Sequence, residues 1–339
     1  MDVKPFITVI LPVLNEEKFI EKSLNSIIAQ TISKEFLEVL VIDGNSSDST
    51  PEIINLYSQK YNYIKLLKNP DQNTIAALNL GIKKALGDFI IRVDGHTYLE
   101  KDYIENCIEV LNRTDADNVG GAMRPIGNTY IQKAIAFATC SIFGIGPGKF
   151  HYSKKEEYVD TVYLGAFRNK LFEEIGAFDP EMHYNEDNEI NLRIIRKGGK
   201  ILLSPKIKSF YFPRDSIHEL WNQYFNYGFF KIKVIQKHKL TSSLRHFVPA
   251  FFLSTLFVSA ILSLFNQAFL YLFYLLVGSY FAATILFSLK ISLSNGLQYF
   301  FVMPFVFATL HLSYGIGFLK GLLILYLFNR IDHNGRRDN

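Results

Sequence analysis

Acidic side chains occur at three places in the sequence where they could bind a metal ion or move a proton. Asp43 follows one apolar run, Asp94 and His96 follow another, and Glu186 with Asp187 opens a polar stretch much farther along the chain. The carboxyl ends of parallel strands meet at one edge of a sheet, where α/β proteins bind nucleotides. The sequence therefore predicts one site for a nucleotide and a cation, built from residues far apart in the chain.

The Asp94-Gly95-His96 motif predicts a divalent-cation site. An oxygen ligand and a nitrogen ligand separated by one residue can hold a cation that bridges two phosphates and neutralises a departing diphosphate. Gly95 would leave room for that diphosphate. Imidazole suits softer metals than Mg²⁺, whereas Mn²⁺ accepts both ligand types, so Mn²⁺ or Mg²⁺ is the expected cofactor. The alternative is an ordinary loop aspartate beside a surface histidine.

Three further carboxylates each have a catalytic and a structural interpretation. Asp43 could accept the ring N–H of a pyrimidine base, or it could only close an Asx turn between a strand and a helix. Asp187 could take the proton from an acceptor hydroxyl, with Glu186 orienting it. Alternatively, Glu186 and Asp187 could only balance the positive end of a helix dipole. The residue types alone leave these alternatives open.

Apolar strands alternate with amphipathic helices along the first part of the chain, and these elements must position the acidic groups. Uniformly apolar strands are typical of a parallel sheet that is covered on both faces. The sequence therefore predicts an α/β fold with a mostly parallel sheet and flanking helices. The predicted strands are 6–14, 38–42, 63–67, 89–93 and 118–123, and the predicted helices are 16–30, 49–61, 74–86, 102–111, 172–176 and 189–197.

A segment rich in Gly and Lys, 142–157, is predicted to be a mobile loop. Its glycines invite comparison with a phosphate-binding loop, but the spacing from Gly144 to Gly148 is one residue too short. Phe150 also stands where that motif needs Ser or Thr. The segment is therefore not expected to bind phosphate.

The last third of the chain is predicted to lie in a membrane. Residues 246–289 contain no Asp, Glu, Lys or Arg, and this run is longer than the roughly 20 apolar residues that cross a bilayer. We expect two to four spans. The predicted arrangement is a catalytic domain at 1–240 with an interfacial helix near 215–240, a membrane domain at 241–330 with best-placed spans at 246–265, 268–289 and 298–319, and a polar tail at 331–339.

Charge and cysteine content limit the remaining possibilities. The net charge is only +4 and no arginine-rich stripe is present, so a nucleic-acid partner is not expected. Cys107 and Cys140 do not form a disulfide framework. A basic cluster precedes the first predicted span, which favours a cytoplasmic (inner) membrane protein whose catalytic domain faces the cytoplasm. Its members are Lys231, Lys233, Lys237, Lys239 and Arg245.

Taken together, the motifs over roughly residues 5 to 235 resemble the family 2 glycosyltransferases of the GT-A fold. Within that family the chain is most similar to the membrane-bound enzymes of succinoglycan-type exopolysaccharide synthesis. The resemblance rests on the order and spacing of several motifs, each weak by itself. They are 10–16 (Ile-Leu-Pro-Val-Leu-Asn-Glu), Asp43-Gly44, Asn79 with Gly81, 92–96 (Arg-Val-Asp-Gly-His), 165–168 (Gly-Ala-Phe-Arg), Glu186-Asp187 and 223–228 (Gln-Tyr-Phe-Asn-Tyr-Gly).

The resemblance implies a role for each matching residue. Asp187 would be the catalytic base with Glu186 beside it, and Asp94 and His96 would hold the metal. The residues expected to bind the nucleotide sugar are Pro12, Asn15, Glu16, Asp43, Asn73, Asp94 and Gly95. The residues expected on the acceptor or diphosphate side are Gly165, Ala166, Phe167, Arg168, Arg214, Gln223 and Tyr227.

The function implied is an inverting sugar transfer. The donor would be a nucleotide-diphosphate sugar, by family analogy UDP-linked, and the acceptor a polyprenyl-diphosphate-linked saccharide held beside the lipid bilayer. Two alternatives remain open. One is a polyprenyl-phosphate sugar synthase, whose acceptor phosphate needs no deprotonation. The other is a membrane-anchored protein that binds nucleotide sugars without catalysis and has no use for Asp187.

Overall fold

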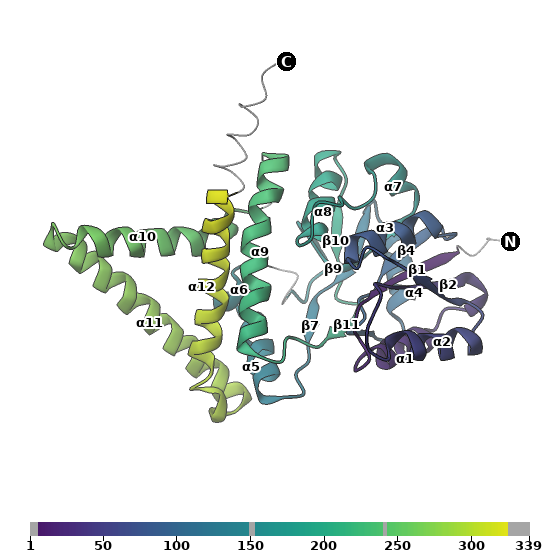
Figure 1. Cartoon of the computed structure of the whole chain (residues 1–339), viewed down its shortest axis with the longest axis horizontal. Helices are drawn as coiled ribbons and strands as arrows, with labels where there is room; N and C mark the ends of the chain where they lie inside the picture. Colours follow the sequence, from purple (N-terminus) through teal and green to yellow (C-terminus); the bar gives the residue numbers. More distant parts are fainter. Residues whose placement is uncertain (1–5, 149–152, 240–242, 325–339) are drawn as a thin grey trace, which may run out of the picture. The chain divides into compact units, whose positions relative to one another are not determined.

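The computed structural model describes residues 6–148, 153–239 and 243–324. The chain forms two compact units (Figure 1). The sheet unit consists of Met1–Pro125 and Lys149–Phe212, and the helical unit consists of Ile126–Gly148 and Pro213–Asn339. The sequence predicted a single domain boundary at residue 240. Residues 126–148 and 213–240, expected in the catalytic domain, belong to the helical unit instead.

An eight-stranded sheet forms the centre of the sheet unit, in the order β3-β2-β1-β4-β9-β6-β10-β8. Strands β3, β2, β1 and β4 run parallel, as do β6 and β10, whereas β9 runs antiparallel to both of its neighbours and β8 runs antiparallel to β10. The predicted α/β fold with a mostly parallel sheet is therefore confirmed. The strands are β1 (Ile7–Val13), β2 (Leu37–Asp43), β3 (Ile64–Lys68), β4 (Phe89–Arg92), β6 (Asn118–Gly121), β8 (Glu157–Tyr158), β9 (Tyr163–Arg168) and β10 (Ile201–Leu203).

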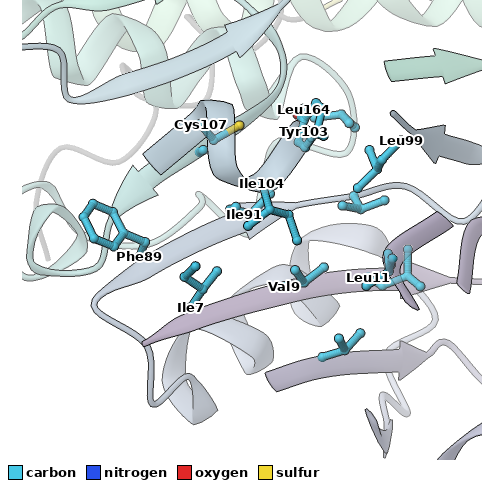
Figure 2. Close-up of a cluster of buried hydrophobic side chains, with 14 of the residues drawn as sticks. Ile7, Val9, Leu11, Phe89, Ile91, Leu99, Tyr103, Ile104, Cys107 and Leu164 are labelled. Carbon is cyan, nitrogen blue, oxygen red and sulfur yellow. The ribbon is translucent and has the colours of Figure 1, made fainter. Parts of the chain in front are cut away.

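Helices cover both faces of this sheet because side chains alternate along each strand. On one face, Ile7, Val9 and Leu11 of β1 point into a cluster with Tyr103 and Ile104 of α4 (Figure 2). On the other face, α3 lies so close to β1 and β2 that a Cβ on Gly81 would come within 2.6 Å of the Ile10 side chain. The helices of this unit are α1 (Ile20–Ile28), α2 (Thr50–Lys60), α3 (Thr74–Lys84), α4 (Tyr103–Arg113), α7 (Lys170–Ile175) and α8 (Glu186–Arg196).

Several elements were not predicted from the sequence. Strand β9 interrupts its apolar character with Gly165 and Arg168, and three-residue strands are too short to show a period. The latter include β10 and the three strands of a small second sheet, β5 (Thr97–Leu99), β11 (Ser209–Tyr211) and β7 (Met123–Pro125). The predicted loop at 142–157 contains a short helix, α6 (Ile142–Ile145), and strand β8, while its residues 149–152 lie outside the described part of the chain.

The helical unit is arranged around its last helix. Helix α12 packs against α5, α6, α9, α10 and α11. Three segments within the described residues are long and apolar enough to cross a membrane, Leu244–Leu262, Gln267–Asn295 and Met303–Ile324, close to the predicted spans. The helices of this unit are α5 (Tyr130–Thr139), α6, α9 (Ile217–His238), α10 (Val248–Leu262), α11 (Gln267–Asn295) and α12 (Met303–Gly321).

Helices α9 and α12 lie side by side with glycines at their contact (Figure 1). A Cβ on Gly228 of α9 would lie 2.1 Å from the carbonyl oxygen of Tyr314, and a Cβ on Gly317 of α12 would lie 2.0 Å from that of Phe225. Small residues let two helix backbones approach this closely. The two helices therefore form one closely packed pair.

The Gly317→Ala variant should destabilise the helical unit, because its methyl group would push α9 and α12 apart. Overpacking of this kind costs about 1–3 kcal/mol. Thermal unfolding of the detergent-solubilised protein should show a lower Tm than the wild type. The matched control is Gly278→Ala on α11, where an added Cβ meets no atom within 4 Å. Equal Tm values for the two variants would contradict the close helix contact.

Candidate active site

The loops that follow β1 and β2 meet at the C-terminal edge of the parallel strands. Asn15 adopts a left-handed conformation with φ of 55°. Its backbone N–H donates to Ser46 Oγ at 2.9 Å, and its side-chain oxygen accepts from the backbone N–H of Ser47 at 2.8 Å. Asn15 thus ties the first loop to the second, which fixes the surroundings of Asp43.

Asp43 is buried at the end of β2, and its carboxylate bonds to Ser46, three residues along the chain, rather than two residues along as in the predicted Asx turn. Its Oδ1 accepts from Ser46 Oγ at 2.5 Å and from the Ser46 backbone N–H at 3.2 Å. A carboxylate has about four acceptor positions in all. The bonds from Ser46 therefore orient Asp43 at the C-terminal edge, and the carboxylate keeps acceptor capacity beyond them.

A carboxylate–imidazole pair joins the loops that follow β1 and β4. His96 Nδ1 lies 2.9 Å from Glu16 Oε1. The acceptor carboxylate holds the proton on Nδ1, so Nε2 is the ring nitrogen that could bind a cation. Gly95 permits this pairing, because a Cβ there would lie 2.8 Å from Glu16 Cγ. Glycine is therefore needed at position 95 for the close packing against Glu16. The sequence alone indicated a different role for this glycine, which was to leave room for a diphosphate.

Arg92, at the end of β4, connects two of the predicted acidic groups. Its Nε lies 2.9 Å from Asp94 Oδ1 and its Nη1 lies 2.9 Å from Glu186 Oε1. Burial lowers the pKa of the Arg92 guanidinium, but the carboxylates of Asp94, Glu186 and Asp187 outweigh it and raise that pKa above its usual range. One fixed positive charge therefore lies among three carboxylates from distant parts of the chain.

Glu186 and Asp187 form the first turn of α8. The helix begins after Asn185, which is left-handed with φ of 62°. Asp187 Oδ1 accepts from the backbone N–H of Asn188 at 2.7 Å. Burial, and to a lesser extent the charge of Asp187, raise the pKa of the Glu186 carboxyl against the opposing effect of Arg92. The Glu186 carboxyl therefore retains a proton more readily than a solvated glutamate.

The residues present fit a divalent cation that also binds substrate. Among residues 6–148, 153–239 and 243–324, no three His, Cys, Asp or Glu side chains lie close enough to hold a metal ion together. Mg²⁺ commonly takes only one or two protein ligands and completes its shell with water and substrate phosphates. Metal-bound imidazoles commonly donate their other ring N–H to a carboxylate, as His96 does to Glu16. Asp94 and His96 therefore remain the residues suited to a cation.

Other predicted site residues in the sheet unit lie in structural positions. Pro12 is paired with Ile42 inside the sheet, and Asn73 caps α3 by accepting from the Ala76 backbone N–H at 2.7 Å. Ala166 and Phe167 are buried in β9. The burial of Ala166 and Phe167 does not support their predicted contact with an acceptor.

Gly165 and Arg168 lie at different places along β9. Gly165 has φ of +100° near the start of the strand, where its backbone conformation requires glycine. Arg168 pairs in register with Phe89, the first residue of β4, and donates to the Leu111 carbonyl at 2.5 Å. Because β4 ends at the acidic groups, Arg168 is at the opposite edge of the sheet and does not join them.

Three predicted acceptor-side residues belong to the helical unit. Arg214 is exposed before α9, and Gln223 Nε2 donates to the Tyr227 hydroxyl at 3.0 Å within α9. Their proposed role on the acceptor side stays a prediction.

The role of Arg92 was missed although the sequence contained a signal for it. A charged residue that ends a buried apolar strand is rarely left without an ionic partner. The sequence shows Arg92 two residues before Asp94, but the second partner, Glu186, becomes apparent only once α8 is folded against the sheet.

Comparison with known proteins decides the family. Residues 8–176 match the model described as glycosyl transferase family 2. A protein of Methanococcus voltae is 30% identical over 332 residues, which cover 94% of this chain and 97% of the relative. The chain belongs to glycosyltransferase family 2. That relative is named dolichyl N-acetyl-alpha-D-glucosaminyl phosphate 3-beta-D-2,3-diacetamido-2,3-dideoxy-beta-D-glucuronosyltransferase.

Further similarities agree with this family 2 assignment. Succinoglycan biosynthesis protein ExoA of Rhizobium meliloti is 28% identical over 317 residues, covering 93% of this chain and 94% of that protein. Among solved structures, the mannosyltransferase PcManGT from Pyrobaculum calidifontis, in complex with GDP-Man and Mn²⁺, gives a TM-score of 0.62 at 20% identity, covering 95% of this chain and 88% of its own. The predicted GT-A fold is confirmed, and this family 2 glycosyltransferase is an enzyme, which removes the purely binding alternative.

The Arg92→Met variant of this glycosyltransferase should be strongly destabilised at neutral pH. Removing one partner of a buried ion pair costs about 3–5 kcal/mol. Without the guanidinium, the carboxyl pKa of Glu186 should rise further above 4.5, its value when solvated. The destabilisation should therefore be largest above the folded-state pKa of Glu186 and shrink as the pH falls toward 4.5. Denaturant unfolding at several pH values measures this.

The matched control is Arg113→Met, which removes the more exposed arginine paired with Glu156. Exposed ion pairs contribute about 0–1 kcal/mol, so this variant should lose little stability. A pH-independent loss in Arg92→Met would show that Arg92 acts only through packing.

Proposed function

We propose that this glycosyltransferase moves a sugar from a nucleoside-diphosphate sugar to a lipid-linked saccharide with inversion at the anomeric carbon. The observation that carries the proposal is the Arg92 bridge between Asp94 and Glu186. It brings the start of α8, with Asp187, to the edge where the cation-binding motif lies. A proton acceptor and a group suited to the leaving diphosphate are thereby close to one another.

Asp187 is the proposed base. It accepts the proton of the acceptor hydroxyl as that oxygen forms a bond to the anomeric carbon. The bond between this carbon and the diphosphate oxygen breaks on the opposite face, and the nucleoside diphosphate leaves with the bonding electron pair. The hydrogen bond from the Asn188 backbone N–H to Asp187 Oδ1 supports this role, because it holds the carboxylate in place.

Asp94 and His96 would hold the divalent cation, with Glu16 orienting the imidazole. When bound, the cation neutralises the charge that develops on the leaving diphosphate. The ion pair with Arg92 holds the Asp94 carboxylate in position. The Mn²⁺ in the PcManGT complex supports a divalent cation for this fold.

The donor and acceptor are proposed by class. Asp43 would bind the nucleobase, and UDP is proposed for the donor from the family resemblance. The relative from Methanococcus voltae is named for a dolichyl-phosphate-linked acceptor, and the apolar helices of this chain suit an acceptor carried by a lipid. We propose a polyprenyl-diphosphate-linked saccharide as acceptor, with the sheet unit on the cytoplasmic side of the membrane.

The Asp187→Asn variant should bind donor but lose transfer. General-base catalysis typically contributes about 10²–10⁴-fold to rate, so the loss in kcat should fall in that range. Product formation from labelled nucleotide sugar measures transfer, and calorimetry measures donor affinity. Asp102→Asn, at an exposed position before α4, is the control and should keep full activity. Wild-type turnover by Asp187→Asn would rule out the assigned base.

The His96→Asp variant should shift metal preference from Mn²⁺ toward Mg²⁺. An all-oxygen ligand pair suits the harder cation, whereas imidazole favours the softer one. The ratio of activities with the two metals, together with Mn²⁺ affinity in the presence of nucleoside diphosphate, measures the change. His183→Asp, at an exposed loop position, should leave the ratio unaltered. An unchanged ratio in His96→Asp would remove His96 from the metal site.

A further inference from the structure

The three apolar helices of the helical unit are not equivalent. Within their most apolar windows, only 11% of α10 and 11% of α11 is buried inside the protein, compared with 44% of α12. Helices α10 and α11 expose large apolar side chains, including Phe251, Phe257, Tyr274 and Phe281. Composition alone makes each helix able to cross a membrane, but the packing separates α12 from the other two.

Helix α12 is covered by a helix that carries charged side chains. The contact of Gly228 with Tyr314 places α9 along α12. Leu220 of α9 packs in one cluster with Phe307 of α12, and the neighbouring side chain of Glu219 is exposed. If α12 crossed the bilayer, α9 would have to enter with it, and Glu219 would face hydrocarbon. A charged side chain at the bilayer centre costs about 2.5–3.5 kcal/mol or more.

Helix α12 is also held by a segment that cannot cross a membrane. Tyr130 of α5 donates to the Gln298 carbonyl at 2.5 Å, and the Phe143 carbonyl of α6 lies 2.7 Å from His311 Nε2. Residues 126–148 join the sheet unit at both ends of the segment. Helix α5 has 10 residues and is therefore about 15 Å long, half the thickness of the hydrocarbon core. The start and the middle of α12 consequently stay on one side.

Helices α10 and α11 form a hairpin that has the properties α12 lacks (Figure 1). The segment Leu244–Leu262 has 19 residues and α11 has 29, so each can cover the roughly 30 Å of a hydrocarbon core. The side chains at the turn are Leu264, 80% exposed, and Phe265, 82% exposed. Nothing in the described residues covers this turn, which continues with the exposed polar residues Asn266 and Gln267 and so suits the water beyond the far membrane surface.

We propose that α10 and α11 cross the bilayer as a hairpin, while α9 and α12 lie together at the membrane surface on the side of the sheet unit. The chain after α12 then emerges on that same side. The sequence after α12 contains Arg330, Arg336 and Arg337, and the positive-inside rule favours the same face of the membrane for them as for the basic residues before α10. This membrane topology does not depend on the donor, the acceptor or the base of the proposed reaction.

Single-cysteine labelling of the full-length protein tests this topology. Cys140 is replaced by Ser, and Cys107 is kept because it is buried and burial raises the pKa of its thiol. One cysteine is then introduced per variant: Glu52→Cys in the sheet unit, Leu264→Cys at the hairpin turn, or a cysteine appended after Asn339. A membrane-impermeant maleimide is applied to intact cells of the expression host and to inverted vesicles.

The topology predicts that the Glu52→Cys and C-terminal thiols react only in inverted vesicles and that Leu264→Cys reacts only in intact cells. Phe265→Cys repeats the measurement at the turn, in case one substitution impairs insertion. Retained sugar transfer by each variant shows that it is folded. A C-terminal thiol that reacts in intact cells would establish three spans and overturn the proposal. A turn that reacts on the same side as Glu52→Cys would overturn the crossing hairpin.

Discussion

A single buried guanidinium determines how the acidic groups of this enzyme are arranged. Arg92 ends a strand in the middle of the sheet, where an unpaired charge would be costly, so Asp94 and Glu186 must both approach it. This requirement links β4 to the start of α8 and thereby positions Asp187. Three carboxylates around one cation leave the site negatively charged. This negative charge supports the divalent cation that is proposed to bind there with the substrate diphosphate.

The loop after β1 has a second organising role. Asn15 and Glu16 are adjacent in sequence, yet the first bonds to the loop after β2 and the second to the loop after β4. The nucleobase side and the metal side of the proposed site are therefore connected through one short segment. A displacement of this segment would therefore move Asp43 and His96 together. Asn15 and Glu16 can position these two residues without touching substrate themselves.

Sequence patterns predicted the parts of the fold that depend on long apolar runs. Strands β1, β2 and β4 were predictable because every side chain in them except that of Arg92 is buried, and their parallel order brought Asp43 and Asp94 to a common edge. Strand β9 was not, since it contains Gly165 and ends in the charged Arg168. The motif that contains Ala166 and Phe167 was assigned to the acceptor because a linear motif does not reveal which end of a strand faces the site. Partners such as Arg92 and Glu186 depend on tertiary packing and could not be paired from local patterns.

The division of the chain between its two units has a consequence for synthesis. Residues 126–148 emerge from the ribosome early, between two stretches of the sheet unit, but the apolar residues Ala134, Ile135 and Ala138 of α5 pack against α12, which is made near the end. The sheet unit can fold once residue 212 has been translated, whereas the apolar face of α5 remains exposed until α12 has been made. Nascent chains of intermediate length thus expose the apolar face of α5 after the sheet unit has folded. Early contact with the membrane or with a chaperone would protect such chains from aggregation.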